Sequence, residues 1–419
     1  MTGVGLVSCL GHDLATARRA LFDGRSGVRH AEGWREKGLK SWVVGSLEGL
    51  EEKRAQAAIP KKLAPAMSSS ALYCALAALD AVADADLADG ALGDARTGCL
   101  VGSGIGDAAS IDHAGNLFAG GRLRRIDPYT VLRAMSSSAS AALVNLLGIR
   151  GRSYSLSSAC ATSAHNIGHA YELIAHGLLD RALAGGGEEP DQLTAAAFQA
   201  LRMALSTRYN DTPERASRPY DAGRDGFVVS GGAGIVVLET LDGALERGAT
   251  IYAEIAGHGA TSDGFDLVLP RPDGSGAAAC MELALADAGL EPAAIDAVNT
   301  HGTGTIHGDL AEVEALRRVF GQAMPPFSST KSMTGHALGA AGVLELIFCL
   351  AMLGDGFVAP SINIENLDPA FEGLPLVTKT FERPLTTMLS NNFGFGGTNA
   401  SLVLRRIGPQ TPGKEPSGD

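Results

Sequence analysis

Short apolar runs bounded by glycine recur along the chain, and each has the length of one buried strand. The clearest runs cover residues 98–101, 182–184, 234–238 and 297–299. An apolar run without alternation is typical of a strand that is covered on both faces of its sheet. Alanine-rich stretches with apolar residues at helical spacing lie between these runs, at 68–83, 161–179, 276–288 and 340–353. This alternation of strands and helices predicts an α/β fold.

The length of 419 residues, 45% of them hydrophobic, is enough for one large domain or two medium ones with a sizeable core. The charged segment DGALERG follows the apolar strand at 234–238 and places an internal boundary near residues 248–251. We therefore expect an N-terminal half at 1–250 and a C-terminal half at 251–407. Residues 408–419, GPQTPGKEPSGD, contain three prolines and no apolar periodicity, which predicts a mobile tail.

Acidic residues outnumber basic ones by 46 to 34, giving a formal charge of -12. This charge argues against nucleic acid or an anionic membrane as the main partner. The six cysteines show no CxxC or other short spacing, so neither disulfides nor structural zinc is expected, and a reducing cytoplasm is the natural compartment. No basic segment precedes an apolar run at the N-terminus, and no stretch of about 20 uncharged apolar residues follows. We expect a soluble, unexported protein.

The segment SYSLSSACATSAHNIGHAYELI, residues 153–174, predicts a strand that turns into a long helix at Cys160. The start of a helix places partial positive charge and free N–H groups beside the sulfur, which favours the nucleophilic thiolate. Small neighbours such as Ser158 and Ala159 permit a sharp turn. Taken alone, a cysteine among alanines and serines is more often a small buried hydrophobic residue, and that interpretation is kept for the other five.

The segment VNTHGTGTIHGD, residues 298–309, predicts a short strand that ends at His301 in a loop of glycine and threonine. Catalytic groups gather on such loops. Thr303 and Thr305 can donate hydrogen bonds to a polar ligand, while the glycines let it approach the backbone. A solvent-facing turn with one ordinary histidine is an equal alternative for this motif, and His307 fits a surface position.

Two further segments carry candidate chemistry. In SSTKSMTGHALGAAGVLELIFCLAML, residues 328–353, Lys331 and His336 lie five apart in a polar loop before an apolar helix. In LSNNFGFGGTNASLVL, residues 389–404, Phe393 and Phe395 alternate with glycines before an apolar strand. A flexible glycine loop that carries phenylalanine can gate an acyl pocket. A hairpin turn with two core aromatics is the alternative.

These four segments, in this order, resemble the β-ketoacyl-acyl carrier protein synthases of the thiolase superfamily. The resemblance runs from about residue 2 to residue 406. The phrases SSACATSAHNIG, STRYNDTPE and APSINIENLD are most similar to the type I bacterial enzyme. The resemblance implies an α/β thiolase-like fold with two similar halves in layered αβαβα order, and a homodimer. It also implies a 3-oxoacyl-[acyl-carrier-protein] synthase that elongates fatty acids or related acyl chains by decarboxylative condensation.

By the same resemblance, Cys160 carries the acyl group as a thioester. His301 and His336 assist decarboxylation of the malonyl carrier and stabilise the enolate, which needs donors where charge develops. Lys331 sets the electrostatics of the site. The backbone N–H groups of Cys160 and Phe395 match the oxyanion hole, and Phe395 also matches the gating phenylalanine.

The resemblance extends to the substrate pocket. Thr303 and Thr305 match residues that bind the phosphopantetheine arm, and Glu345 matches a buried acid that organises the site. Phe393 is expected to line the pocket, and Ile105, in VGSGIGD, resembles the chain-length-limiting isoleucine of the type II enzyme. No permanently bound cofactor and no metal are expected. The phosphopantetheine arm of the acyl carrier protein enters as part of the substrate.

The carrier protein is acidic, so the resemblance implies a basic docking site. The expected docking residues are Lys61, Lys62, Arg122, Arg124 and Arg125. Any one of them is also explained as an ordinary solvated charge. Pro65 stands where the type I enzyme has an arginine, a departure that weakens the first part of this patch.

Other functions fit some of these features. A noncatalytic chain-length partner of another synthase usually lacks the nucleophile, which Cys160 supplies here. A thiolase uses a second cysteine where this chain has His336, and a plain cysteine hydrolase needs no second histidine. The segment IHGD at 306–309 departs from the proline-containing pattern of the family, which keeps a specialised pathway synthase open. Acyl length, unsaturation, pathway and the need for a partner synthase are not encoded in these motifs.

Overall fold

The computed structural model describes residues 1–88, 90–201 and 204–407. Its two large sheets each contain five strands. The first sheet has the spatial order β1 (Gly3–Val7), β7 (Gly232–Glu239), β6 (Arg181–Glu188), β4 (Thr97–Gly102) and β5 (Ser153–Tyr154). The second has the order β8 (Glu254–Ser262), β14 (Thr398–Arg405), β13 (Thr387–Gly394), β9 (Ala297–Asn299) and β10 (Phe327–Ser328). Two short pairs join β2 (Val28–His30) to β3 (Val43–Gly45) and β11 (Phe357–Val358) to β12 (Phe381–Glu382).

The two large sheets repeat one topology. In the first, β4 pairs in parallel with β5 and β6, and the antiparallel pairs β6–β7 and β7–β1 follow. In the second, β9 pairs in parallel with β10 and β13, and the antiparallel pairs β13–β14 and β14–β8 follow. The order of the strands and their directions are therefore the same in the two sheets. The expected α/β fold of two similar halves is confirmed.

The helices cover and separate these sheets. They are α1 (Leu14–Phe22), α2 (Leu50–Gln56), α3 (Ser69–Asp84), α4 (Ala108–Ala119), α5 (Thr130–Ala134), α6 (Ser138–Leu147), α7 (Thr162–Ala175), α8 (Gln192–Ala200), α9 (Leu241–Glu246), α10 (Ser275–Ala288), α11 (Ile306–Phe320), α12 (Lys331–Thr334) and α13 (Ala341–Asp355). The 3-10 turns are η1 (Ala64–Ala66), η2 (Leu123–Arg125), η3 (Ala159–Ala161), η4 (Pro213–Arg215), η5 (Pro292–Ala294), η6 (Gly321–Ala323), η7 (Leu338–Ala340) and η8 (Pro369–Phe371).

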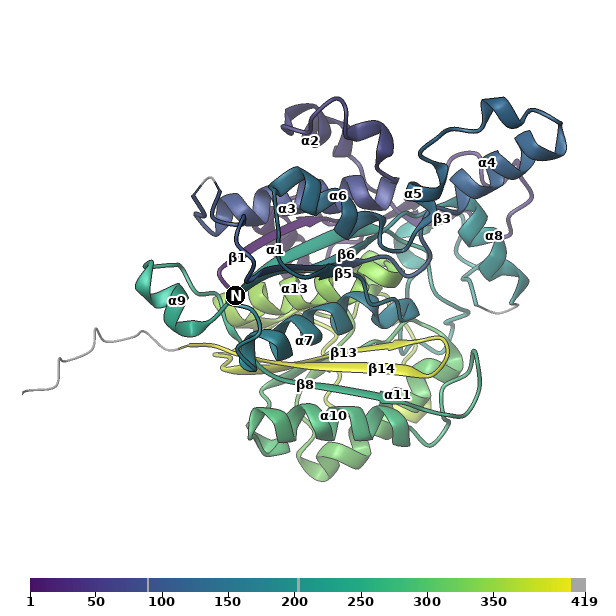
Figure 1. Cartoon of the computed structure of the whole chain (residues 1–419). Helices are drawn as coiled ribbons and strands as arrows, with labels where there is room; N and C mark the ends of the chain where they lie inside the picture. Colours follow the sequence, from purple (N-terminus) through teal and green to yellow (C-terminus); the bar gives the residue numbers. More distant parts are fainter. Residues whose placement is uncertain (89, 202–203, 408–419) are drawn as a thin grey trace, which may run out of the picture.

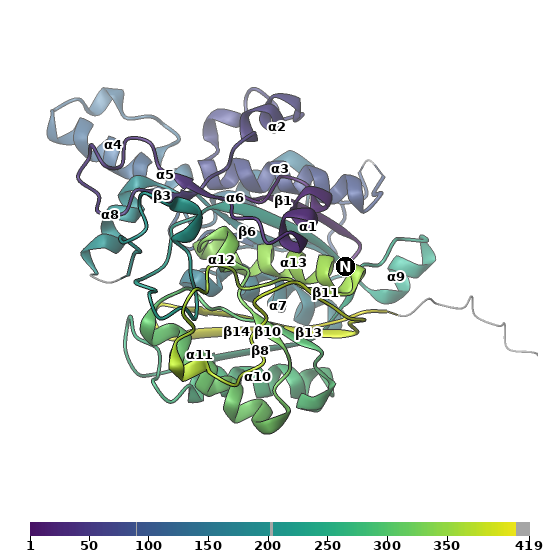
Figure 2. The same ribbon diagram turned by 180° about the vertical axis from the view of Figure 1, so that it is seen from behind.

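Five layers follow one another through the molecule (Figure 1). Helices α3 and α6 cover the outer face of the first sheet, and α10 and α11 cover the outer face of the second. Helices α7 and α13 lie between the two sheets, as the view from behind also shows (Figure 2). This is the αβαβα order that the resemblance implies. The helices of the inner layer are the ones that carry the chemistry described below.

Burial explains the composition of α13. Every residue from Ala341 to Leu353 is buried, because sheets face this helix on both sides. The stretch Leu338–Asp355 is long and apolar enough to cross a membrane by length and composition, but 89% of it is buried inside the protein. Its composition is accounted for by its place in the core, and by length and composition it is the one such helix in the described part of the chain.

The predicted elements are confirmed with small shifts at their ends. The four predicted strands correspond to β4, β6, β7 and β9, and the four predicted helices to α3, α7, α10 and α13. The polar loop expected around Lys331 contains a short helix, α12. The expected boundary at 248–251 lies between α9 and β8. The expected tail at 408–419 lies outside the described residues.

Candidate active site

Cys160 lies in η3, directly before the inner helix α7. The preceding residue, Ala159, has a φ of +50°, a left-handed conformation that alanine rarely adopts. The second half repeats this device, because Leu338 of η7 has a φ of +49° directly before the inner helix α13. The turns η3 and η7 contact each other. The sulfur is therefore presented where the two inner helices begin, at the joint between the halves.

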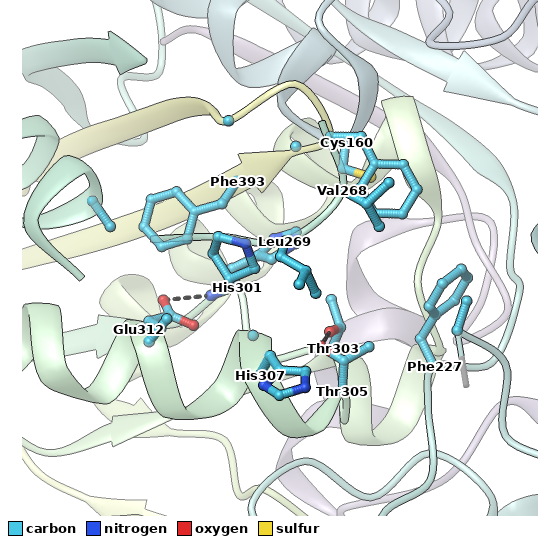
Figure 3. A pocket seen from close by; sticks show the side chains of 18 of the residues that line it. Cys160, Phe227, Val268, Leu269, His301, Thr303, Thr305, His307, Glu312 and Phe393 are labelled. Atoms are coloured by element: carbon cyan, nitrogen blue, oxygen red, sulfur yellow. Dashed lines mark hydrogen bonds between the residues drawn. The ribbon is translucent and has the colours of Figure 1, made fainter. Parts of the chain in front are cut away.

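One pocket of about 320 Å³ receives most of the predicted site residues (Figure 3). Cys160 lines it from the first half, and His301 and His336 line it from the second. The same pocket is lined by Thr303, Thr305, Phe393 and Phe395. Folding thus brings Cys160 into one pocket with two imidazoles that follow it by more than 140 positions in the sequence.

The two imidazoles lie edge to face, with ring centroids 5.2 Å apart. Nδ1 of each ring is buried without a hydrogen-bond partner among the described residues, and both rings line the pocket. Burial lowers the pKa of His301 well below its ordinary value, and the nearby Lys331 ammonium and His336 lower it further. Burial and Lys331 also lower the pKa of His336. Both rings are therefore neutral at physiological pH.

The Cys160 thiol is buried, and burial raises its pKa to about 12. The Lys331 ammonium and the backbone N–H groups of Phe395 and Cys160 lower this pKa, while the charge of Glu188 raises it. The backbone N–H of Cys160, at the start of α7, therefore favours the thiolate as predicted, but burial has the larger effect. A helix terminus contributes about 1 kcal/mol, less than one pKa unit, and desolvation outweighs it. The two N–H groups that face the sulfur are the pair predicted for the oxyanion hole.

Lys331 and Glu345 form a buried ion pair behind the pocket rather than in its lining. Both side chains are almost fully buried, and Lys331 Nζ donates to Glu345 Oε1. Asn392 Nδ2 donates to the other carboxylate oxygen at 2.7 Å. Burial raises the pKa of Glu345, and the Lys331 ammonium lowers it. The pair fixes a positive charge close enough to affect Cys160 and both histidines.

The turn at His301 is held by Glu312, a residue that the sequence motifs do not single out. Its carboxylate of helix α11 accepts from the backbone N–H groups of His301 and Gly302, both at 2.8 Å. Burial raises the pKa of Glu312 to about 7, and these N–H groups lower it. The only signal in the sequence that could have revealed Glu312 is a carboxylate on the apolar face of a helix. Close by, the hydroxyls of Thr303 and Thr305 lie 3.0 Å apart on the pocket wall (Figure 3).

Aromatic rings form another wall that the sequence does not reveal. Phe198 packs on Phe227 with ring centroids 5.2 Å apart, and on Phe395 at 5.9 Å. Phe227 in turn packs edge to face on His336 at 5.4 Å. Phe395 lies in the turn of the β13–β14 hairpin, at the pocket lining. Thus the two interpretations of this segment, a hairpin with aromatics and a loop at an acyl pocket, describe the same structure.

Other predicted residues lie away from the pocket lining. Ile105 is 42% exposed and does not line the pocket of the single chain. The expected docking residues are exposed, do not line the pocket and form no ion pair with a described residue; they are Lys61, Lys62, Arg122, Arg124 and Arg125. Within residues 1–88, 90–201 and 204–407, no group of three or more His, Cys, Asp or Glu side chains is arranged to hold a metal ion.

Comparison with known families agrees with this geometry. Residues 1–244 match the β-ketoacyl synthase N-terminal domain, and residues 252–365 match the β-ketoacyl synthase C-terminal domain. The chain belongs to the β-ketoacyl synthase family, whose members are condensing acyltransferases. Within the family it is 48% identical over 413 residues to 3-oxoacyl-[acyl-carrier-protein] synthase 1 of Escherichia coli (strain K12), which covers 97% of this chain and 98% of the relative. Its activity is that of a type I 3-oxoacyl-[acyl-carrier-protein] synthase.

Solved structures give the same result. A β-ketoacyl synthase from Burkholderia phymatum STM815 superposes with a TM-score of 0.92 at 38% identity, covering 97% of this chain and 98% of that one. A ketosynthase bound to a hexaketide, in complex with a type II polyketide acyl-carrier protein, superposes with a TM-score of 0.87 at 30% identity and the same coverage. The expected fold and family are thereby confirmed.

Proposed function

We propose that this chain elongates acyl chains with Cys160 as the acyl carrier and His301 and His336 as the enolate-stabilising pair. One observation carries the proposal: one thiol and two neutral imidazoles line a single pocket. A cysteine hydrolase needs one imidazole as a base. Two neutral imidazoles aimed at the same space instead suit a reaction whose transition state develops negative charge on oxygen.

In the first half-reaction, the Cys160 sulfur attacks the thioester carbonyl of an acyl carrier. The carbonyl oxygen becomes an oxyanion that accepts hydrogen bonds from the N–H groups of Cys160 and Phe395. The bond to the pantetheine sulfur then breaks, and the proton of Cys160 passes to the departing thiolate. Because the thiol is protonated at rest, proton loss accompanies attack rather than preceding it.

In the second half-reaction, the malonyl carrier loses carbon dioxide and leaves its bonding electrons in an enolate. With its proton on Nε2, each imidazole donates a hydrogen bond to the enolate oxygen. The enolate carbon attacks the acyl carbonyl on Cys160, a carbon-carbon bond forms, and the sulfur leaves as a thiolate that takes up a proton. Loss of carbon dioxide supplies the carbanion, so no strong base is required.

The pocket also suits the phosphopantetheine arm, which we propose enters past Thr303 and Thr305 as part of the substrate. Their hydroxyls bond each other, which leaves one O–H and the oxygen lone pairs to bond its amides. Phe393 and Phe395 give the reacting end an apolar wall. The partner we propose is an acyl carrier protein, acyl-loaded and then malonyl-loaded, as in the related ketosynthase complex. No permanently bound cofactor is part of the proposal.

We also propose that the chain forms a homodimer. Large apolar side chains are exposed together on α4, η2 and α5; they are Ile111, Phe118, Leu123, Val131 and Leu132, between 44% and 69% exposed. A group of large exposed apolar side chains is typical of a protein interface, and a second copy is the occupant that the closed symmetry of most oligomers favours. Light scattering on the purified protein checks this proposal, and a monomer at micromolar concentration contradicts it. We place the protein in the cytoplasm, where its free cysteines stay reduced.

The assay that tests the proposed function uses the purified chain alone with acyl and malonyl carriers. Mass spectrometry of the intact protein is expected to show one acyl group on Cys160, and 3-oxoacyl carrier is expected to accumulate. Cys160→Ala should abolish both, whereas Cys349→Ala, a buried cysteine outside the pocket, should retain them. Product formation by Cys160→Ala, or a requirement for a second synthase, contradicts the proposal.

A further inference from the structure

A second buried carboxylate lies beside the Cys160 turn, and the mechanism above does not use it. Glu188 ends strand β6 and is 1% exposed. Its Oε1 accepts from Ser103 Oγ at 2.6 Å, and its Oε2 accepts from the N–H of Gly104 at 2.8 Å and of Gly339 at 3.1 Å. It forms no ion pair with a described residue. A buried carboxylate with donors but no cation is costly, so its placement calls for a reason.

The donors of Glu188 come from both halves and lie against the nucleophile turn. A Cβ on Gly104 would lie 3.0 Å from the Ala159 carbonyl oxygen, so this loop packs directly on the left-handed residue before Cys160. Gly339 belongs to η7, the turn that contacts η3. A Cβ on Gly339 would lie 2.5 Å from Gly104 N and 2.6 Å from Glu188 Oε2. The carboxylate therefore clamps two segments that must approach without side chains between them.

The repeated topology gives this contact a further meaning. Cys160 and Gly339 occupy equivalent positions, because each follows a left-handed residue in the 3-10 turn that precedes an inner helix. The N–H of Cys160 faces the reacting sulfur, whereas the N–H of Gly339 donates to Glu188. The second half thus has its own copy of the anion-binding turn, and that copy holds a fixed carboxylate of the protein.

We propose, on the basis of the proposed function, that Glu188 is a positioning residue: its carboxylate locks the Cys160 turn against the matching turn of the second half. Its charge also acts on the sulfur in opposition to that of Lys331. Glu188 is expected to touch no substrate, since it does not line the pocket. Its effects are expected in the geometry of the N–H groups at Cys160 and in the ease with which the thiol loses its proton.

The electrostatic half of the proposal, the effect of the Glu188 charge on the Cys160 thiol, has a definite direction. Among the charged groups that face Cys160, Lys331 lowers the pKa of the thiol and Glu188 raises it. Burial raises the pKa of Glu188 itself to about 7, while Ser103 and the N–H groups of Gly104, Ile105 and Gly339 lower it. The Glu188 charge therefore grows as the pH rises through about 7, and above that pH it holds the thiol protonated more strongly.

Alkylation of Cys160 by iodoacetamide tests this direction without any carrier substrate. Glu188→Gln keeps the shape of the side chain and removes the charge, so alkylation is expected to be about threefold faster or more at about pH 8, with the pH profile moved to lower pH. Glu189→Gln is the matched control, because Glu189 is the next residue, partly buried and acidic, and has no part in the Cys160 surroundings. Equal rates for Glu188→Gln and the unmodified protein, with matching circular dichroism, would overturn the electrostatic half.

Acyl-transfer kinetics test the clamp. Glu188→Ala removes all three acceptor contacts, and kcat is expected to fall about tenfold or more with KM unchanged, because misplaced oxyanion donors act on the transition state. Glu188→Gln, whose amide oxygen still accepts from both backbone N–H groups, is expected to stay within about threefold of the unmodified kcat. A Glu188→Ala enzyme with full kcat, or one in which only KM changes, would overturn the clamp.

If Glu188→Ala fails to fold, Ser103→Ala takes its place, since it removes one of the three bonds to Glu188 together with those that Ser103 Oγ accepts from the N–H groups of Ile105 and Gly106. A reduced kcat supports the clamp, and an unchanged kcat overturns it. The two readouts also separate this proposal from the proposed function. In one outcome, the unmodified protein forms no 3-oxoacyl product while Glu188→Gln is still alkylated faster than the unmodified protein. That pair of results would overturn the proposed function and support the assignment of Glu188.

Discussion

The two pocket imidazoles differ from ordinary histidines because burial and the Lys331 ammonium lower the pKa of both. A histidine with an ordinary pKa of about 6.5 would be half protonated at that pH. His301 and His336 instead remain neutral as the pH falls through 6.5, and they take up protons only well below it. Their ability to donate from Nε2 without carrying charge is therefore constant across the physiological range.

We accordingly expect the rate of carbon dioxide release from a malonyl carrier to stay level, within about twofold, between about pH 8 and pH 6. In Lys331→Met, which lacks the ammonium, both pKa values rise, but burial is the larger cause and still holds them below the ordinary value, so the rate is again expected to stay level in this range. Stopped-flow or radiometric measurement of carbon dioxide release checks both profiles. An unmodified enzyme that loses half its rate near pH 6.5 would contradict the neutral-imidazole interpretation.

The buried pair Lys331–Glu345 contributes to stability and to chemistry in separable ways. Lys331→Met leaves the Glu345 carboxylate without its cation, and the free energy of unfolding is expected to fall by about 3 kcal/mol. The double variant Lys331→Met, Glu345→Leu removes both charges and is expected to recover most of that loss, because apolar replacement of a buried pair is often neutral.

Urea unfolding of the single and double variants measures this stability difference, and acyl transfer measures the chemistry. Activity is expected to stay low in the double variant, since the positive charge near Cys160 and the histidines is still absent. A double variant that regains activity together with stability would show that Lys331 acts only by filling the core.

At the same scale, the reactive residues could be predicted while their ionisation could not. Cys160, His301 and His336 stand in short motifs whose neighbours are visible in the sequence. The raised pKa of the thiol depends on burial by segments far away in the chain. Glu188 and Glu312 were missed for the same reason, because only the fold shows which acidic residues are buried against backbone N–H groups.

Among the elements, the inner helices α7 and α13 approach each other more closely than side chains would normally allow. A Cβ on Gly342 of α13 would lie 2.7 Å from Ala164 N of α7. The nearest atom is backbone, so relief requires the two helices to move apart. Gly115 of α4 is also a helical glycine, but nothing lies within 4 Å of its Cβ position.

Gly342→Ala is therefore expected to lower the free energy of unfolding by about 1–3 kcal/mol. Acyl transfer is expected to fall as well, because the turns η3 and η7 lie directly before the two helices in contact. Gly115→Ala is expected to be neutral or to add up to about 1 kcal/mol, since alanine favours a helix over glycine. Thermal and urea unfolding of the pair provide the comparison. Equal stability of the two variants would contradict the close packing of the inner layer.

Element types were predictable here because apolar runs and helical spacing are strong local signals. The left-handed residues Ala159 and Leu338 were not, since neither alanine nor leucine signals a positive φ and the tertiary contacts of η3 and η7 hold them there. The short helix α12 was missed for a related reason. Its four residues are too few to show a period, and burial rather than pattern stabilises them.

For the whole molecule, the decisive arrangement is the pairing of two similar halves. No repeat is visible in the sequence, although order and direction of the strands repeat. Backbone topology is preserved by spacing and burial, which many different residues satisfy, so the sequence can diverge while the fold does not. The active site lies at the joint and draws on both halves, which is why no single motif defines it.

The charge of the whole chain bears on how a carrier protein docks. A formal charge of -12 repels an acidic partner at long range, so binding requires a local surface of opposite sign. Arg122, Arg124 and Arg125 lie in and beside η2, are exposed and form no ion pair with a described residue. Their charges are thus free for a partner instead of being neutralised within the chain.

Replacing these three arginines by serine is expected to raise KM for an acidic acyl carrier about tenfold at low salt, with kcat unchanged, because rim charges act on encounter rather than on chemistry. Raising the salt concentration should shrink the difference, since these charges are screened. The matched control replaces three exposed, unpaired cations elsewhere, Arg19, Arg150 and Lys379. A short acyl-pantetheine thioester, which lacks the carrier, should react equally well with all three proteins. An equal loss with the short thioester would place these arginines in the catalytic step rather than at the docking surface.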